Sequence, residues 1–139
     1  MFKLASVALL ALISVSCLGS DFEDSIERSW QLTSGRVDGA EIPIVATHPI
    51  TISFDGGEVD GTAACNGYGG QYALSGSSIS FESLAFTEMA CSPQEVMDSE
   101  QMYADAITRV EQVVLDNGLV LRGTGVELVF EAVEPDAGS

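Results

Sequence analysis

The 139-residue sequence predicts a mainly β domain with one helix, built as a curved antiparallel sheet or a partly closed β-barrel of about eight short strands. Two observations carry this prediction. Short segments with alternating apolar residues recur along the chain between glycine-containing turns. One longer segment after residue 92 instead repeats its apolar residues at helical spacing, and further strand-like segments follow it. The helix is therefore expected before the last three strands, against an open end or a face of the sheet.

Strand-like segments occupy the first half of the chain. Each places its apolar side chains on one face, as a half-buried strand does. These segments are residues 29–34, 50–54, 58–63, 71–75 and 78–82. The turn Asp55-Gly56-Gly57 joins the second to the third, and a hairpin about Gly76-Ser77 joins the last two. A loop from Ser83 to Cys91 is predicted next.

One substantial helix is predicted over Pro93–Val110. The stretch Ser92-Pro93-Gln94-Glu95 is a capping-box pattern with proline at the first helical position. Apolar residues then recur at helical spacing, at Val96, Tyr103, Ile107 and Val110. The acidic residues between them are assigned to the solvent-exposed face of the helix: Glu95, Asp98, Glu100 and Asp105.

The chain after the helix is predicted to form three more strands, at residues 112–116, 119–122 and 126–131. Asn117-Gly118 separates the first two of them. This dipeptide is the strongest short hairpin signal in the sequence, because both residues tolerate the positive φ angles of a tight turn.

The N-terminal residues 1–16 are predicted to be a signal peptide. A short positive start is followed by the apolar run Leu4–Val15, whose roughly 12 residues fall short of the ~20 that a membrane-spanning helix needs. The stretch Ile13-Ser14-Val15-Ser16-Cys17 resembles a bacterial lipobox, in which the cysteine carries lipid and becomes the first mature residue. Its small residues also suit ordinary signal peptidase. We therefore expect a membrane-anchored lipoprotein with lipidated Cys17, with a secreted soluble protein as the alternative.

A single folded domain is expected after the signal peptide, since the chain is 46% hydrophobic and too short to form two well-sized hydrophobic cores. Residues 17–29 are predicted to be the N-terminal anchor and linker, with an Asp/Glu/Ser-rich stretch over Ser20–Glu27. Residues 30–132 are the expected domain. Residues 133–139 are expected to form a flexible tail.

Charge and histidine content exclude several classes of function. Five Lys and Arg residues stand against 21 Asp and Glu residues, for a net charge of −16, so no basic surface for nucleic acid can be assembled. We interpret the acidity as a solvated surface. His48 is the single histidine, which leaves little material for His-based zinc sites or Ser-His-Asp hydrolysis. It is interpreted as a solvated loop residue.

Cys65 and Cys91 remain once Cys17 is assigned to lipid. In an exported chain they favour a disulfide, which would close a loop of about 26 residues and add roughly 3.5 kcal/mol to the free energy of unfolding. Two separate buried thiols are the alternative. Neither cysteine has a second cysteine or a histidine at ligand spacing, so no metal site is predicted.

The stretch Asp55–Gly61 is the best calcium candidate, because it holds three carboxylates in a short span. Glycine occupies its third position, where an EF-hand needs Asp or Asn, so a hairpin turn with solvated charges is favoured. No glycine-rich loop precedes a lysine, which leaves phosphate binding without support. We predict no catalytic residue and no cofactor.

Four stretches of the chain resemble, in their order, the META-domain or HslJ-like family: Trp30–Leu32, Ile50–Asp55, Gly61–Tyr72 and Thr87–Cys91. The resemblance runs from about Trp30 to Phe130. The chain departs from the family pattern at Gly67 and Glu88, where the family often has arginine, and at Ala64, where glycine commonly precedes the cysteine. Any role of those arginines is therefore not carried over.

The resemblance implies a bacterial envelope or secreted domain, often a lipoprotein, with a barrel-like β fold and no established catalytic chemistry. Its signature positions here are Cys65, Asn66, Tyr68, Thr87, Met89 and Cys91. We interpret them as structural, with a ligand-contacting surface as the alternative. Asn66 can satisfy neighbouring amides, and Tyr68 supplies an apolar ring.

The predicted function is that of a non-catalytic envelope module, with stress- or envelope-related binding of a protein or small ligand. Such a module predicts an exposed apolar patch or a lined barrel mouth. The alternative is a secreted hydrolase, which would need two convergent carboxylates in a cleft. The oligomeric state is left open.

Overall fold

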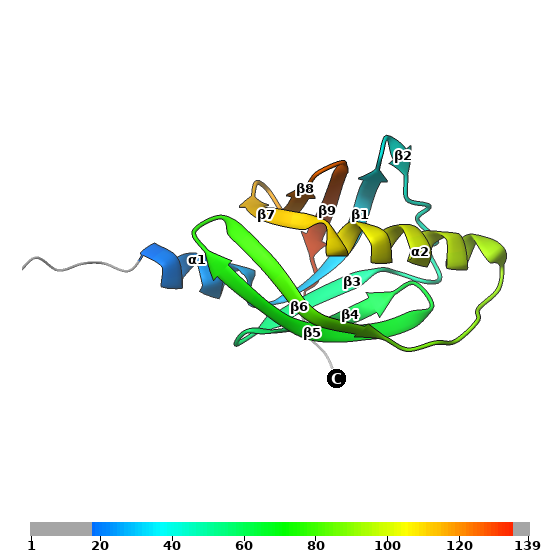
Figure 1. Cartoon of the computed structure of the whole chain (residues 1–139), viewed down its shortest axis with the longest axis horizontal. Coiled ribbons are helices and arrows are strands. Elements are labelled where there is room, and N and C mark those ends of the chain that lie inside the picture. The colour runs from blue at the N-terminus through cyan, green and yellow to red at the C-terminus, as the bar shows by residue number, and fades with distance from the viewer. Residues whose placement is uncertain (1–17, 135–139) are drawn as a thin grey trace, which may run out of the picture.

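Residues 18–134 are described by the computed structural model, which shows an antiparallel β-barrel (Figure 1). Its strands pair in the order β1-β3-β4-β5-β6-β7-β8-β9, and β9 pairs again with β1 to close the ring. The short strand β2 pairs with the end of β1 outside this ring. The strands are β1 Ser29–Val37, β2 Ala40–Glu41, β3 Thr51–Asp55, β4 Glu58–Ala63, β5 Asn66–Ser75, β6 Ser78–Phe86, β7 Val110–Leu115, β8 Leu119–Gly123 and β9 Val126–Ala132. The helices are α1 Leu18–Ile26 and α2 Gln94–Thr108.

The predicted fold class is confirmed, and every predicted strand is present. Three strands are longer than the sequence predicts by three or more residues: β1 continues to Val37, β5 begins at Asn66, and β6 continues to Phe86, through part of the predicted loop. The apolar alternation is interrupted in β5 and β6 by a bulge, in which Gly70 lies opposite Ser83 and its neighbour. Ser83 has a φ of 55°, and a Cβ on Gly70 would lie 2.7 Å from the Glu82 carbonyl oxygen. The bulge therefore depends on glycine at this position.

The predicted hairpin turns are confirmed. Gly56 and Gly57 have φ angles of 56° and 88° in the turn between β3 and β4, a conformation that glycine adopts without strain. Asn117, with a φ of 52°, lies in the turn between β7 and β8. The Asp55–Gly61 stretch is thus a hairpin, as the sequence favours.

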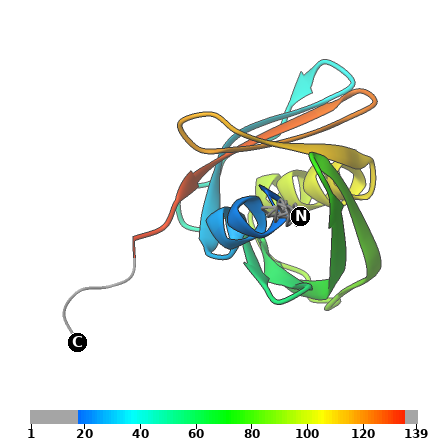
Figure 2. The ribbon, with the colours of Figure 1, turned by 90° about the vertical axis from the view of Figure 1, so that its left-hand side faces the viewer.

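The expected linker over Ser20–Glu27 is helical as far as Ile26, because this part belongs to α1, which lies over one end of the barrel (Figure 2). Ile26 is fully buried, and its carbonyl oxygen accepts a hydrogen bond from Trp30 Nε1 at 3.0 Å. Gly56 N donates to the Glu27 carboxylate at 2.9 Å, which ties the end of the helix to the β3–β4 turn. Apolar residues occur only at Phe22 and Ile26, so the polar composition of the stretch hides a short amphipathic helix.

The barrel interior is filled by side chains from all eight barrel strands, so it is a packed core. The buried residues include Trp30, Leu32, Ile52, Phe54, Val59, Tyr68, Tyr72, Ile79, Val113, Leu119, Leu121, Leu128 and Phe130. Aromatic rings interlock within this core, for example Phe54 and Tyr72, whose ring centroids lie 5.0 Å apart at an angle of 84°.

Helix α2 begins at Gln94, with Pro93 at the N-cap and no side-chain capping hydrogen bond. The predicted capping box is therefore wrong, because the helix begins one residue later than the pattern requires and Ser92 lies outside the cap position. Val96, Tyr103 and Ile107 are buried, as predicted.

No helix within residues 18–134 has the length and hydropathy needed to cross a bilayer.

The acidic residues of α2 do not all face solvent. Glu95, Asp98 and Asp105 are exposed, as predicted. Glu100 is buried, with 8% of its surface exposed, so its assignment to the solvent face is wrong. It lies four residues after Val96 and three before Tyr103, which places it on the buried stripe of the helix.

The pairing around the barrel is weakest between β6 and β7. These strands pair at a single position, Ser78 with Gln112, and one adjoining bond runs from Val113 N to the Ser77 carbonyl oxygen at 2.9 Å. They lie side by side at one end and then diverge (Figure 1). Most of β6 therefore has a partner on one side only.

Candidate functional site

A disulfide joins Cys65 to Cys91, as the sequence favours over two free thiols. Cys65 immediately precedes β5, and Cys91 lies between β6 and α2, so the bond ties the base of β5 to the loop that leads into the helix. The 26-residue separation gives an expected contribution of roughly 3.5 kcal/mol to the free energy of unfolding. Met97 Sδ accepts a hydrogen bond from Cys91 N at 3.4 Å and adds a contact with α2.

The side-chain amide of Asn66 is fully hydrogen-bonded. Its Oδ1 accepts from Thr87 Oγ1 at 2.9 Å and from Met89 N at 2.6 Å. Its Nδ2 donates to the Met89 carbonyl oxygen at 3.0 Å and to Glu100 Oε2 at 2.7 Å. An amide has two donor protons and two acceptor lone pairs, so no hydrogen-bonding capacity is left for a ligand.

Glu100 is the partner of Asn66, which the sequence pattern does not indicate. Its Oε1 accepts from Asn66 N at 2.6 Å, and its Oε2 accepts from Asn66 Nδ2 at 2.7 Å. No arginine, lysine or histidine of the described residues forms an ion pair with Glu100. Two charge-assisted hydrogen bonds from one asparagine therefore offset much of the desolvation of this carboxylate. The available signal was the position of Glu100 on the apolar stripe of the helix.

Two buried tyrosine hydroxyls, those of Tyr68 and Tyr103, form a hydrogen bond near the Asn66 and Glu100 side chains. Tyr68 OH donates to the Thr51 carbonyl oxygen at 2.7 Å and lies 2.6 Å from Tyr103 OH. Because the Tyr68 proton is directed at a carbonyl, Tyr103 is the donor in the pair. The Tyr68 ring stacks on Phe86 at a centroid distance of 5.2 Å. Tyr68 thus supplies both the ring that the sequence predicts and a hydrogen bond between β5 and α2.

The loop 87–91, which comprises Thr87–Cys91, is held from several sides. Thr87 N donates to the Gly67 carbonyl oxygen at 2.9 Å, and the Met89 backbone is bonded at both N and O to Asn66. The Met89 side chain is 58% exposed. The signature residues therefore converge on one place, where they hold a loop rigid and leave one methionine side chain in solvent.

Two carboxylates, Glu41 and Glu127, line one outer hollow of the described chain, and each forms an ion pair with an arginine, Arg36 and Arg122 respectively. Glu100 is the only buried carboxylate of the described residues, and both of its oxygens are occupied by Asn66. Within residues 18–134 no group of three or more His, Cys, Asp or Glu side chains has an arrangement that could hold a metal ion. His48 is half-buried in its loop, where its Nδ1 lies 3.0 Å from Thr47 Oγ1.

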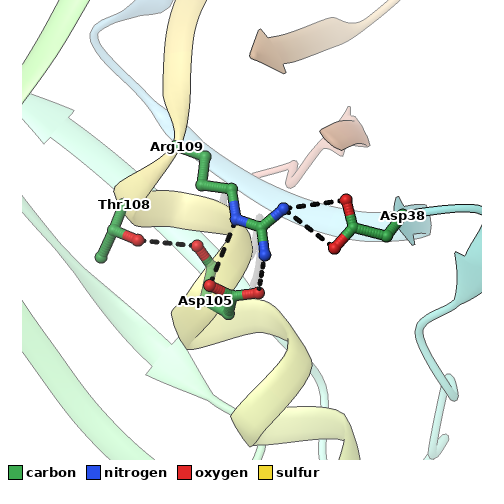
Figure 3. Close-up of polar contacts among 4 residues, drawn as sticks. All are labelled: Asp38, Asp105, Thr108 and Arg109. Carbon is green, nitrogen blue, oxygen red and sulfur yellow. Dashed lines mark hydrogen bonds and ion pairs between the residues drawn. The ribbon is translucent and has the colours of Figure 1, made fainter. Parts of the chain in front are cut away.

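Arg109 fixes the other end of α2 through the contacts drawn in Figure 3. Its Nη1 lies 3.0 and 3.1 Å from the two carboxylate oxygens of Asp38, in the turn between β1 and β2. Its Nη2 and Nε bind Asp105 at 2.6 and 3.3 Å. The guanidinium is shared between two carboxylates, so it clamps the helix to the barrel and is not free for an anionic ligand.

Two hollows lie on the outside of the barrel. One, of about 300 Å³, lies beside β2 and is lined by Thr33, Arg36, Glu41, Ile42, Ile44 and Glu127. A second, of about 530 Å³, lies where α1 meets β1 and the end of β9. Neither hollow is lined by a signature residue.

A family model described as the META domain matches residues 23–135. The chain belongs to the META-domain family. The resemblance of the signature stretches is thereby confirmed. No curated protein matches the chain.

Solved structures share the fold of this META domain. An NMR structure of a protein from Burkholderia xenovorans is 23% identical, with a TM-score of 0.67, and the match covers 97% of this chain and 100% of that one. A crystal structure of a DUF4847 family protein from Bacteroides vulgatus is 13% identical, with a TM-score of 0.56 and coverages of 80% and 96%. A crystal structure of a lipocalin-like protein from Bacteroides uniformis is 17% identical, with a TM-score of 0.51 and coverages of 78% and 98%. At these identities the likeness shows the fold alone.

The Glu100→Gln variant of the META domain should lose about 1–3 kcal/mol of unfolding free energy. Asn66 presents two donors to this side chain, and a glutamine would turn its own NH₂ group toward one of them. Denaturant unfolding measures the loss. The exposed Glu95→Gln variant on the same helix is the matched control and should change stability by less than about 0.5 kcal/mol. Equal stabilities of the two variants would contradict the role given to Glu100.

Alkaline pH should destabilise the META domain through its tyrosines. Burial raises the pKa of Tyr68, Tyr72 and Tyr103, and the neighbouring Tyr103 raises the pKa of Tyr68 further. The stabilisation from protonated tyrosine is therefore complete below the unfolded-state pKa of about 10 and is lost as the pH rises above it toward the folded-state values. Unfolding free energy should fall above about pH 10 by roughly 1.4 kcal/mol per pH unit for each such tyrosine.

The measurement for this prediction combines denaturant unfolding with the ultraviolet absorbance of tyrosinate. Tyrosinate should appear together with unfolding, and the Tyr103→Phe variant should show a shallower pH dependence. Tyrosines that ionise near pH 10 in the folded protein would rule the prediction out.

Proposed function

We propose that this protein is an exported, non-catalytic binding module of the cell envelope, and that loop 87–91 is its contact surface for a partner protein. One observation carries the proposal: the Asn66 amide bonds the Met89 backbone at both N and O, while the Met89 side chain is 58% exposed. A large apolar side chain in solvent, on a loop fixed by hydrogen bonds and a disulfide, has no evident structural task of its own.

The fixed loop suits binding energetically. Ordering a mobile loop on association costs binding free energy, and a loop that is already ordered avoids that cost. Methionine is flexible and polarisable, so it adapts its shape to an apolar pocket on a partner. The disulfide and Thr87 hold the two ends of the loop, and between them Met89 is the exposed large apolar residue.

A non-catalytic role is supported by the internal hydrogen bonds that the buried polar side chains around the signature residues already make. Asn66, Glu100 and the Tyr68–Tyr103 pair are all bonded to one another or to the backbone. The META-family match and the lipocalin-like neighbour fit a binding fold. The hydrolase would need two carboxylates that converge in a cleft, and among the described residues the carboxylates in the outer hollow beside β2, Glu41 and Glu127, are both ion-paired with arginines.

Export is supported by the disulfide, since disulfides persist in oxidising compartments. The signal peptide and Cys17 lie outside the described residues, so lipidation stays a prediction. Helix α1 begins at Leu18, directly after that cysteine. A lipid on Cys17 would therefore leave only this short helix between the membrane surface and the barrel.

The test places a photo-crosslinking amino acid at position 89 in the native host. We expect covalent adducts of defined mass in the envelope fraction, because Met89 contacts a partner. The matched control carries the same group at Leu115, a partly exposed apolar residue at the distant end of β7 (Figure 1). Adducts at neither position, or equal adducts at both, would contradict a contact role for loop 87–91.

The intact mass of the same material tests export. A chain that begins at Cys17 with added acyl mass supports the anchored module. A chain cleaved elsewhere without acyl mass supports the secreted form, and an uncleaved chain recovered from the cytoplasm would overturn export.

A further inference from the structure

Strand β6 has one unpaired edge over most of its length. It pairs with β5 from Ser78 to Phe86, but with β7 only at Ser78. Tyr72 N donates to the Gly57 carbonyl oxygen at 2.9 Å, away from β6, so Tyr72 and its partner Phe81 form a non-hydrogen-bonded pair. The backbone N–H and C=O of Phe81 therefore point to the free edge, where they can pair with another strand.

The side chains beside this edge are less buried than their inward direction implies. Phe81, Leu84 and Phe86 pack against the core, yet all three remain partly exposed. Phe81 stacks on Phe54 at a centroid distance of 6.3 Å, which shows that it points into the barrel. A strand added along the edge would cover the exposed sides of these residues and extend the apolar interior.

The charge beside the edge is negative and unpaired. Glu82 on β6 and Glu111 on β7 are exposed, and neither forms an ion pair with another residue of the described chain. Arginines are scarce, and three of the four in the described residues are already paired with carboxylates. A partner with basic side chains is therefore complementary to this edge.

We propose that the free edge of β6 docks an extended segment of a partner protein in which apolar and basic residues alternate. The segment pairs with the Phe81 backbone, turns its apolar side chains inward onto Phe81 and Leu84, and turns its basic side chains outward toward Glu82 and Glu111. The bulge at Ser83 bends the strand, so regular pairing is confined to the short stretch before it. This inference rests on the proposed function, because it gives the binding module a second contact surface and a class of partner.

The test uses the mature protein and a short peptide that alternates valine and lysine. We expect the peptide to bind, to shift the Phe81 amide resonance and to slow its hydrogen exchange. A peptide that alternates valine and glutamate should bind at least about tenfold more weakly. The Glu82→Lys variant should weaken binding of the valine–lysine peptide about tenfold, whereas the exposed Glu131→Lys variant on β9 is the matched control and should not.

Three results would overturn the proposal. A peptide of the same composition with its lysines in one block could bind equally well, which would show attraction by charge alone. Resonance shifts could map away from β6. The Phe81 amide could be protected without peptide in a concentration-dependent manner, which would assign the edge to a second copy of the chain. Failure of this test leaves the crosslinking at Met89 unaffected, so the two surfaces are judged separately.

Discussion

The pairing of the Asn66 amide with the Glu100 carboxylate is the interaction on which the arrangement of β5, α2 and loop 87–91 depends. A buried carboxylate without hydrogen bonds is strongly disfavoured, and so is a buried amide. Each of these side chains satisfies the other, and the remaining amide groups of Asn66 then fix the Met89 backbone. Removal of either partner would leave the other buried and unsatisfied.

This pairing sits between two further anchors of α2. The disulfide at Cys91 holds the loop just before the helix, and Arg109 clamps its last turn to Asp38. The helix is thereby held before its start, near its middle and at its end while its apolar stripe packs into the barrel. Helix α2 is also the segment that connects β6 to β7, and these two strands pair at only one position. The anchored helix and the free edge of β6 therefore belong to the same connection in the barrel.

The sequence predicts the barrel well because local patterns specify it. Alternating apolar residues identify the strands, and Asn117-Gly118 identifies a hairpin. Glu100 is predicted wrongly because acidic residues of a helix usually face solvent, and its partner on β5 lies 34 residues away in the sequence. Helix α1 carries apolar residues at helical spacing, Leu18, Phe22 and Ile26, but it is missed because the Asp, Glu and Ser residues between them indicate a linker. The signature pattern identifies the residues of this region, but only the three-dimensional arrangement shows that Asn66 bonds the Met89 backbone while the Met89 side chain is exposed.

Hydrogen exchange at the Met89 backbone amide tests whether Asn66 fixes loop 87–91. That amide donates to Asn66 Oδ1 at 2.6 Å, although the side chain of the same residue is largely in solvent. Slow exchange is expected at Met89 in the native protein, and in the Glu100→Gln variant exchange at Met89 should accelerate by a larger factor than at the amides of β9, which follow only the loss of global stability. Exchange at Met89 as fast as in an unstructured peptide would contradict this role of Asn66, because loop 87–91 would then be mobile.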